Sequence, residues 1–317
     1  MPVSLAIAIP TFNRSHALEE NLPAILSEAS EKQVSVYVSD DSTQDCSEHL
    51  CRRLQLEHSN LHYVRNRPSL GHDLNLLSTL SWPQEDYVWL LGDKIRPNSG
   101  ELPRLLEFIV GHDLVFLSRS NQPTLTTSYS NKSEAVEFLR SILWNQTLTG
   151  ATIFSRKVID FFFKKNRNIH KNFPQLDVIL TYSEEFEESH LRIGWYGPPI
   201  LRVVENGTSY WRFDAINVFV SDWVSVVSSY PKTVPESITD EVLRSHSKNS
   251  KLFGLSFLHE LHKADKFKAS DLRRFKFWAV MHLPRPMIYF ALAPDFIFNP
   301  VKKLKKAIDT IKDDAKK

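Results

Sequence analysis

The sequence has few glycines and lacks the glycine-rich motifs of two common classes of nucleotide-binding protein. Only 9 of its 317 residues are glycine, and neither G-x-G-x-x-G nor G-x-x-x-x-G-K-[ST] occurs. Those motifs bring the backbone close to phosphate in dinucleotide-binding and P-loop proteins, so both classes lose their main support. A hydrophobic fraction of 42% with 24% charged residues nevertheless predicts an ordinary folded protein.

Cysteine is also scarce, which argues against a disulfide framework. The two cysteines, Cys46 and Cys51, lie five residues apart in a predicted helix and therefore on different faces of it. Neither a disulfide nor a metal site is indicated, and this fits a reducing compartment. The first residues run directly into an apolar strand without a leader-like segment, so we expect a cytoplasmic protein.

Long uninterrupted apolar runs are missing as well. The segment 275–298 is rich in aromatic and aliphatic residues, but Pro284, Pro286 and Pro294 interrupt it. A spanning helix needs about 20 apolar residues with little interruption. We therefore do not expect this segment to cross a membrane.

A basic amphipathic segment follows the proline-broken stretch. Residues 271–317 contain 11 Lys or Arg and 5 Asp or Glu. The segment 301–311 is predicted to form a helix with lysines opposite an apolar face of Val301, Leu304, Ile308 and Ile311. Such a helix favours binding to the surface of an anionic membrane. The alternative is a tail that packs on the rest of the chain or on a second copy, with its lysines in water.

Polar side chains follow three predicted strands in the first hundred residues. The apolar segments concerned are 4–9, 34–39 and 87–91, and the residues that follow them are Thr11, Asn13 and Arg14, then Asp40 and Asp41, then Asp93 and Lys94. Ligands of parallel sheets bind beyond the carboxyl ends of the strands. Polar residues after a single strand are explained by the formation of a turn. Polar residues after three strands in succession favour a nucleotide site.

Helical segments alternate with these strands. Further strands are predicted at 61–64, 114–117, 150–154 and 200–204, and helices at 15–30, 44–56, 72–80, 133–142 and from 174. This order predicts an α/β fold with a doubly wound, mostly parallel, Rossmann-like sheet. A helical, amphipathic C-terminal extension follows it.

Four segments of the chain, in this order, resemble glycosyltransferase family 2, the inverting enzymes of GT-A fold. They are residues 8–14, 38–42, 66–75 and 89–93, with weaker similarity through 150–156. The sequences of these segments are most similar to those of the branch that builds bacterial O-antigen and capsular polysaccharide. The resemblance implies a GT-A domain over 1–215, with a nucleotide-binding half (1–100) and an acceptor half (101–215), followed by an extension over 216–317.

The resemblance also implies roles for individual residues. It assigns nucleotide binding to Pro10, Thr11, Asn13, Asp40 and Asp41. The neighbouring residues that complete the candidate substrate site are Arg14, Arg67, Gly71, Asn75 and Lys94. Trp211 is a candidate to stack on a sugar ring, with Arg212 beside it.

Asp93 lies where the family has its metal-binding acidic motif, and we expect it to take part in catalysis. Here the motif reads Gly92-Asp93-Lys94, with one carboxylate where the family usually offers two or three. Asp93 could bind Mg²⁺ or Mn²⁺ if diphosphate oxygens and water complete the shell. Alternatively Lys94 or Arg212 neutralises the diphosphate directly, or the donor site has lost activity.

Inversion requires a general base to deprotonate the acceptor hydroxyl. The family places this carboxylate at the start of a helix after the strand that resembles 150–154, and Asp177 fits that position. Glu184 and Glu185, two turns further on, are the alternatives. A first-turn Asp that merely complements the helix dipole is the other interpretation of Asp177.

Together with these observations, the resemblance implies an inverting glycosyltransferase that moves a sugar from a nucleotide-sugar, with UDP the expected nucleotide. The expected acceptor is a glycan, lipid-linked, in bacterial surface polysaccharide synthesis, and the protein would lie peripherally on the inner face of the cell membrane. No nucleic-acid partner is expected, and a homo-oligomer is left open. The alternative is a non-catalytic scaffold that binds nucleotide or glycan. A nucleotidyltransferase would need a glycine-rich basic loop after the first strand, which is missing here.

Overall fold

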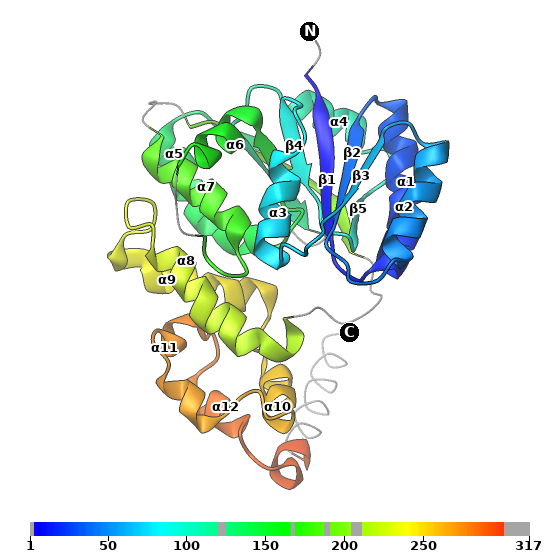
Figure 1. Cartoon of the computed structure of the whole chain (residues 1–317). Coiled ribbons are helices and arrows are strands. Elements are labelled where there is room, and N and C mark those ends of the chain that lie inside the picture. Colours follow the sequence, from blue (N-terminus) through cyan, green and yellow to red (C-terminus); the bar gives the residue numbers. More distant parts are fainter. Residues whose placement is uncertain (1–2, 120–124, 166–168, 187–190, 204–210, 301–317) are drawn as a thin grey trace, which may run out of the picture. The chain divides into compact units, whose positions relative to one another are not determined.

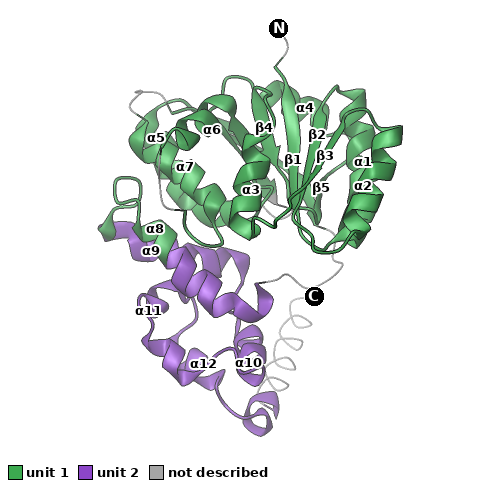
Figure 2. Ribbon diagram, viewed as in Figure 1, with its two compact units in different colours: residues 1–208, 225–236 green, residues 209–224, 237–317 purple. Residues whose placement is uncertain are grey.

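The computed structural model describes residues 3–119, 125–165, 169–186, 191–203 and 211–300 (Figure 1). The chain divides into two compact units (Figure 2). Unit 1 comprises Met1–Thr208 and Ser225–Glu236, and unit 2 comprises Ser209–Val224 and Ser237–Lys317. The domain boundary after residue 215 stays a prediction, and the helix expected over 301–311 lies outside the described residues.

Unit 1 is built on one mixed sheet of nine strands in the described part of the chain. The strands are β1 (Leu5–Thr11), β2 (Ser35–Asp40), β3 (Leu61–Arg65), β4 (Tyr87–Leu90), β5 (Ile95–Pro97), β6 (Leu114–Arg119), β7 (Thr127–Tyr129), β8 (Thr152–Ser155) and β9 (Ile193–Val203). Their order is β3-β2-β1-β4-β8-β6-β9-β5, and β7 pairs with β9. Strands β3, β2, β1 and β4 run parallel, as predicted, whereas β8 is antiparallel to both neighbours.

Helices cover both faces of this sheet. They are α1 (Ser15–Glu31), α2 (Cys46–Glu57), α3 (His72–Ser81), α4 (Leu102–Phe108), α5 (Lys132–Ile142), α6 (Arg156–Phe163) and α7 (Pro174–Glu185), with a 3₁₀ helix at Leu143–Thr147. Figure 1 shows α3 and α7 side by side on the face turned toward the viewer, and residues of the two helices are in contact. The doubly wound α/β prediction is confirmed.

Side-chain alternation along the strands explains why both faces are covered. Leu5, Ile7 and Ile9 of β1 join a buried cluster with Leu22 of α1 and other apolar residues of α1, α2 and α4. The residues between them point to the other face, because successive strand residues alternate. There the small Ala8 is fully buried. Strands buried on both sides read as continuous apolar runs, which is why the sequence revealed them.

Three details of the prediction need correction. The last strand was expected at 200–204, but β9 begins at Ile193 because its first half pairs in parallel with β6. The short edge strands β5 and β7 were not predicted, and neither were α4 and α6. Three-residue strands are too short to show an alternating pattern.

Unit 2 consists of short helices. They are a 3₁₀ turn at Arg212–Asp214, a π-helical segment at Asn217–Asp222, α9 (Glu236–Ser250), α10 (Leu255–Lys263), a 3₁₀ turn at Ala269–Arg273, α11 (Phe277–Val280) and α12 (Arg285–Phe290). Helix α8 (Trp223–Ser228) spans the border between the units. The ring of Phe298 stacks on His259 at 3.6 Å between centroids and is buried. The proline-broken stretch is therefore part of the core of unit 2.

No helix within the described ranges is long and apolar enough to cross a membrane. Within the segment 275–298, α11 and α12 are separate short helices. Its prolines fall at helix starts, where a missing N–H costs nothing, as Pro284 does before α12.

Candidate functional site

The carboxyl ends of β1 and β4 bring three side chains together. Thr11 donates its hydroxyl to Oδ2 of Asp93 at 3.0 Å, and Arg14 donates from its guanidinium to Oδ1 at 2.9 Å. Asn21 of α1 donates to the Asp93 carbonyl oxygen. Thr11 and Asp93 are buried, while the Arg14 side chain keeps 31% of its surface exposed. We call Thr11, Arg14 and Asp93 the strand-end cluster.

Lys94 adds a second cation beside this cluster. Burial lowers the pKa of its ammonium group below the ordinary value, and the nearby Arg14 guanidinium lowers it further, while Asp93 acts in the opposite direction. Two cations, Arg14 and Lys94, thus lie near the Asp93 carboxylate and repel each other. An anion bound there would relieve the repulsion between them.

The strand-end cluster fits a divalent cation poorly. Both oxygens of Asp93 already accept hydrogen bonds, one of them from a guanidinium whose positive charge would repel a metal ion. Among the residues that the structure describes, no three His, Cys, Asp or Glu side chains form a group that could hold a metal ion. The predicted Mg²⁺ or Mn²⁺ site at Asp93 thus stays a prediction.

A second group of contacts centres on Asp41. Its carboxylate accepts from the hydroxyl of Ser69 at 2.6 Å and from the backbone N–H groups of Leu70 at 2.7 Å and Gly71 at 2.9 Å. Asn66 donates to it as well. Gly71 has φ +80°, a conformation that side chains rarely adopt. Asp41 therefore fixes the loop that leads into α3.

Asp40, the neighbouring carboxylate, is also fully buried and bound by the protein. It accepts from the Tyr63 hydroxyl at 2.8 Å and from the Ser42 N–H at 2.9 Å. Burial and this hydrogen bond raise the pKa of Tyr63. Asp40 thus holds the turn after β2, on which Ser42 accepts from the N–H of Asn13.

Asn75 links the Asp41 loop to the strand-end cluster. Its side-chain oxygen accepts from Ser39 at 2.8 Å and from Asn66 at 3.0 Å, and its amide nitrogen lies 3.4 Å from the carbonyl oxygen of Thr11. Asn75 is 3% exposed. The structure therefore brings most of the predicted nucleotide site to one edge of the sheet.

The remaining predicted residues of the nucleotide-binding half are Pro10, Asn13 and Arg67. Pro10 is opposite Ser39 in the β1–β2 register. Asn13 has φ +51° and exchanges side-chain hydrogen bonds with Thr43. Arg67 is 68% exposed and lies 3.3 Å from Glu48. Its guanidinium is therefore accessible from solvent.

Asp177 lies in the first turn of α7, and its side chain is 1% exposed. Its Oδ1 accepts from the Tyr230 hydroxyl at 2.9 Å and lies 2.6 Å from Nδ1 of His170. Its Oδ2 accepts from the His170 backbone N–H at 2.7 Å. Nε2 of His170 lies 2.9 Å from the hydroxyl of Ser229. We call these four residues the Asp177 centre.

The Asp177 centre is tied to the nucleotide-site edge through Asp73. Asp73 belongs to the first turn of α3, two residues after Gly71, and accepts from the backbone N–H of Asn172 at 3.1 and 3.2 Å. Asn172 and His170 lie in the same loop. The two groups of predicted residues therefore belong to one edge of unit 1.

The alternative bases have other partners. Glu184 accepts from the backbone N–H of Lys232, and Glu185 lies 3.6 Å from Lys165. Neither glutamate takes part in the hydrogen bonds of the Asp177 centre as the structure gives them. The first-turn position favours Asp177 over both.

Trp211 and Arg212 belong to unit 2. Arg212 forms a two-pronged ion pair with Glu260 at 2.8 and 3.0 Å, and Trp211 packs edge-on against Phe219. Two hydrogen bonds to one carboxylate commit the guanidinium to an internal partner. Their assignment to the substrate site stays a prediction.

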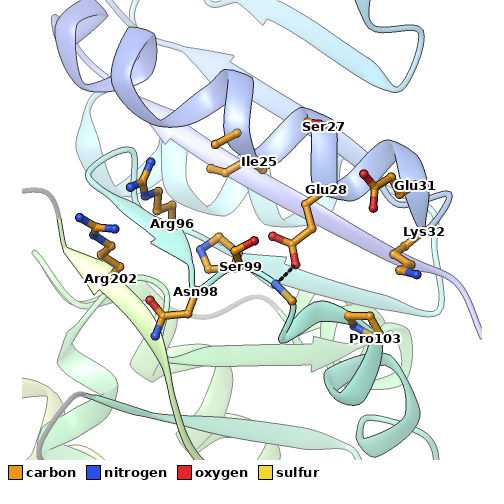
Figure 3. A pocket seen from close by; sticks show the side chains of 13 residues that line it. Ile25, Ser27, Glu28, Glu31, Lys32, Arg96, Asn98, Ser99, Pro103 and Arg202 are labelled. Carbon is orange, nitrogen blue, oxygen red and sulfur yellow. Dashed lines mark hydrogen bonds between the residues drawn. The ribbon is translucent and has the colours of Figure 1, made fainter.

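A separate pocket of about 590 Å³ lies along the second half of α1 (Figure 3). Glu28 on one wall accepts from the N–H of Gly100, and the opposite end carries Arg96 and Arg202, which are paired across β5 and β9. None of the residues predicted from the sequence to bind substrate lines this pocket. The predicted substrate residues at the strand ends therefore lie outside this pocket.

Sequence reasoning missed His170, Tyr230 and Ser229. His170 precedes Asp177 by seven residues in a loop, and Tyr230 follows it by 53 residues. No helical or strand spacing relates these positions, so no local pattern could have signalled them. The tertiary contacts alone assemble the Asp177 centre.

A mostly parallel sheet covered by helices on both faces, with polar residues gathered at its strand ends, is the arrangement expected of a GT-A fold. The sequence profile described as Glycosyl transferase family 2 matches residues 6–173, more than half of the chain. The chain therefore belongs to glycosyl transferase family 2, which confirms the resemblance.

Individual relatives agree with this assignment. The abequosyltransferase RfbV of Salmonella typhimurium (strain LT2) is 31% identical over 93 residues, a match that spans 28% of this chain and 27% of that protein. The structure of S. aureus TarS residues 1–349 with UDP-GlcNAc has a TM-score of 0.56 at 13% identity, covering 95% of this chain and 92% of that one.

A second solved structure shows the same fold. The mannosyltransferase PcManGT from Pyrobaculum calidifontis, in complex with GDP-Man and Mn²⁺, has a TM-score of 0.54 at 13% identity. It covers 92% of this chain and 84% of that one. At these identities the likeness concerns the fold.

Proposed function

We propose that this protein is an inverting glycosyltransferase that moves a sugar from a nucleotide-sugar to a glycan acceptor in bacterial surface polysaccharide synthesis. Family membership supports the reaction type, and the partial likeness to an abequosyltransferase supports the polysaccharide context. The observation that carries the proposal is the strand-end cluster, where Thr11 and Arg14 converge on Asp93 at the sheet edge.

The donor diphosphate is proposed to bind beside Arg14 and Lys94. Both cations lie near the Asp93 carboxylate. Cations placed there would attract a diphosphate and stabilise the charge that develops on the leaving group. Asp41 and Gly71 would position the nucleoside indirectly, by fixing the loop before α3. UDP is the proposed nucleotide.

The acceptor is proposed to bind at the Asp177 centre, where its hydroxyl is deprotonated. The link between Asp73 and Asn172 supports this, because it connects the centre to the donor edge. A lipid-linked acceptor, with the segment 301–317 on the inner membrane surface, is the proposed setting. The excess of lysine in that segment supports it.

The experiment is a donor screen with purified protein. UDP-GlcNAc, UDP-glucose, UDP-galactose and GDP-mannose are incubated with it, and release of nucleoside diphosphate is measured with and without a lipid-linked glycan extract. Wild type should release nucleoside diphosphate from at least one donor, and Asp93→Ala should not. Leu56→Ala is the matched control, since Leu56 is an exposed side chain on α2.

The second candidate is a non-catalytic scaffold that binds nucleotide or glycan. It is favoured by one observation, that the acidic motif is reduced to a carboxylate already paired with Arg14. Tight UDP binding without turnover of any donor would support this candidate over the enzyme.

A further inference from the structure

Asp177 cannot be reached by an acceptor hydroxyl in this structure. Its side chain is 1% exposed, and both oxygens are engaged by His170 while Tyr230 also donates to Oδ1. A general base must lie within hydrogen-bond reach of the proton that it takes. The carboxylate therefore needs an intermediary between itself and the substrate.

His170 has the geometry of that intermediary. An ionised carboxylate accepts only, so the 2.6 Å contact places a proton on Nδ1 of His170 and leaves the lone pair on Nε2. The His170 side chain is 20% exposed, and the contact between Nε2 and Ser229 lies at the surface. The basic nitrogen thus faces the accessible side of the centre.

Ser229 can satisfy both protonation states of this imidazole. Its hydroxyl lies 2.9 Å from Nε2 of His170 and 2.9 Å from the carbonyl oxygen of Ser225. With neutral His170 the single hydroxyl proton points to Nε2. When Nε2 gains a proton, the hydroxyl turns to Ser225 and accepts from His170 instead. No heavy atom has to move between the two states.

Resting on the proposed function, we infer that His170 is the general base of glycosyl transfer and that Asp177 is its positioning residue. The acceptor hydroxyl takes the place of Ser229 at Nε2 and gives its proton to that nitrogen. The oxygen electron pair forms the bond to the anomeric carbon, and the bond to the donor phosphate breaks with its electron pair on the leaving phosphate oxygen. The imidazolium, stabilised by Asp177, later releases its proton to water.

The test compares His170→Ala, His170→Gln and the control His58→Gln, using the most active sugar nucleotide of the four. Both His170 variants should lower kcat roughly 10²- to 10⁴-fold, the usual contribution of a general base. Affinity for UDP, measured by calorimetry, should stay within threefold. Added imidazole should restore part of the turnover of His170→Ala and none of Asp177→Ala. His58→Gln should behave as wild type.

Two results would overturn the inference. One is turnover of both His170 variants within threefold of wild type. The other is a His170→Ala variant that still binds UDP, and is therefore folded, but gains no turnover from added imidazole. If wild type turns over no donor, the proposed function itself fails, which is a different outcome from an active enzyme that does not need His170.

Discussion

The guanidinium of Arg14 lies 2.9 Å from the carboxylate of Asp93, at the point where the family usually has a cluster of acidic residues. This pairing occupies one oxygen of Asp93 while Thr11 occupies the other. A positively charged side chain therefore stands where a metal ion would be expected. The proposed donor site thus carries its positive charge in the protein itself.

Removal of divalent metal should lower transfer only modestly, because Arg14 and Lys94 would neutralise the diphosphate. Wild type is assayed with EDTA beside Asp93→Ala and Arg14→Gln, both of which should lose transfer. Complete loss of wild-type activity in EDTA, restored by Mn²⁺, would show instead that an ion displaces Arg14 from Asp93.

Lys94 should make UDP affinity depend on pH in the alkaline range. Burial lowers the pKa of its ammonium below the ordinary 10.5, so the charge is lost at a lower pH than in an exposed lysine. Affinity for UDP should fall as the pH rises through that pKa. Lys94→Arg keeps its charge over the range and should abolish this limb in calorimetric titrations, and an unchanged limb would remove Lys94 from the site.

Asp41→Ala should weaken UDP binding by loosening the loop before α3. The change leaves the N–H groups of Leu70 and Gly71 without their acceptor, so the loop loses the hydrogen bonds that hold it in place. Asp40→Ala should also reduce affinity, because Tyr63 and Ser42 lose their acceptor. Calorimetry with UDP is combined with thermal melting, and unchanged affinity in both variants would contradict the donor-site assignment.

Deletion of residues 301–317 should release the protein from anionic liposomes. Lysines near an anionic surface contribute about 1 kcal/mol each, so binding should weaken as salt is raised. A deletion from residue 271 would instead remove the buried Phe298 and Phe277 from the core of unit 2. Co-sedimentation of full-length and shortened chains at two salt concentrations is the measurement, and equal binding by both would assign the tail another role.

The sequence was sufficient for the parallel half of the sheet. Strands such as β1 are apolar throughout because helices cover both faces, and the residues after them are polar because the strands end at the ligand edge. The edge strand β5 could not be found, since three residues carry no readable pattern. Its pairing with β9 depends on contacts about 105 residues apart in the chain.

The residues of the candidate site likewise fall into two groups, those that the sequence could predict and those that it could not. Thr11, Asp41 and Asp93 could be predicted because each lies at or just after the end of a strand. The environment of Asp177 was not visible, because His170 lies in a loop and Tyr230 comes from a distant segment. Burial of Asp177 is a property of the assembled fold, and it changes how the carboxylate could act.

The most direct test of the central claim is turnover of a sugar nucleotide by the purified full-length chain. With UDP-GlcNAc, UDP-glucose, UDP-galactose and GDP-mannose as donors, wild type should release nucleoside diphosphate from at least one, faster when glycan acceptor is present. Asp93→Ala should release none above background. Nucleoside diphosphate release that is absent with all four donors and acceptor extract, despite measurable binding of UDP, would contradict the enzyme and leave the scaffold.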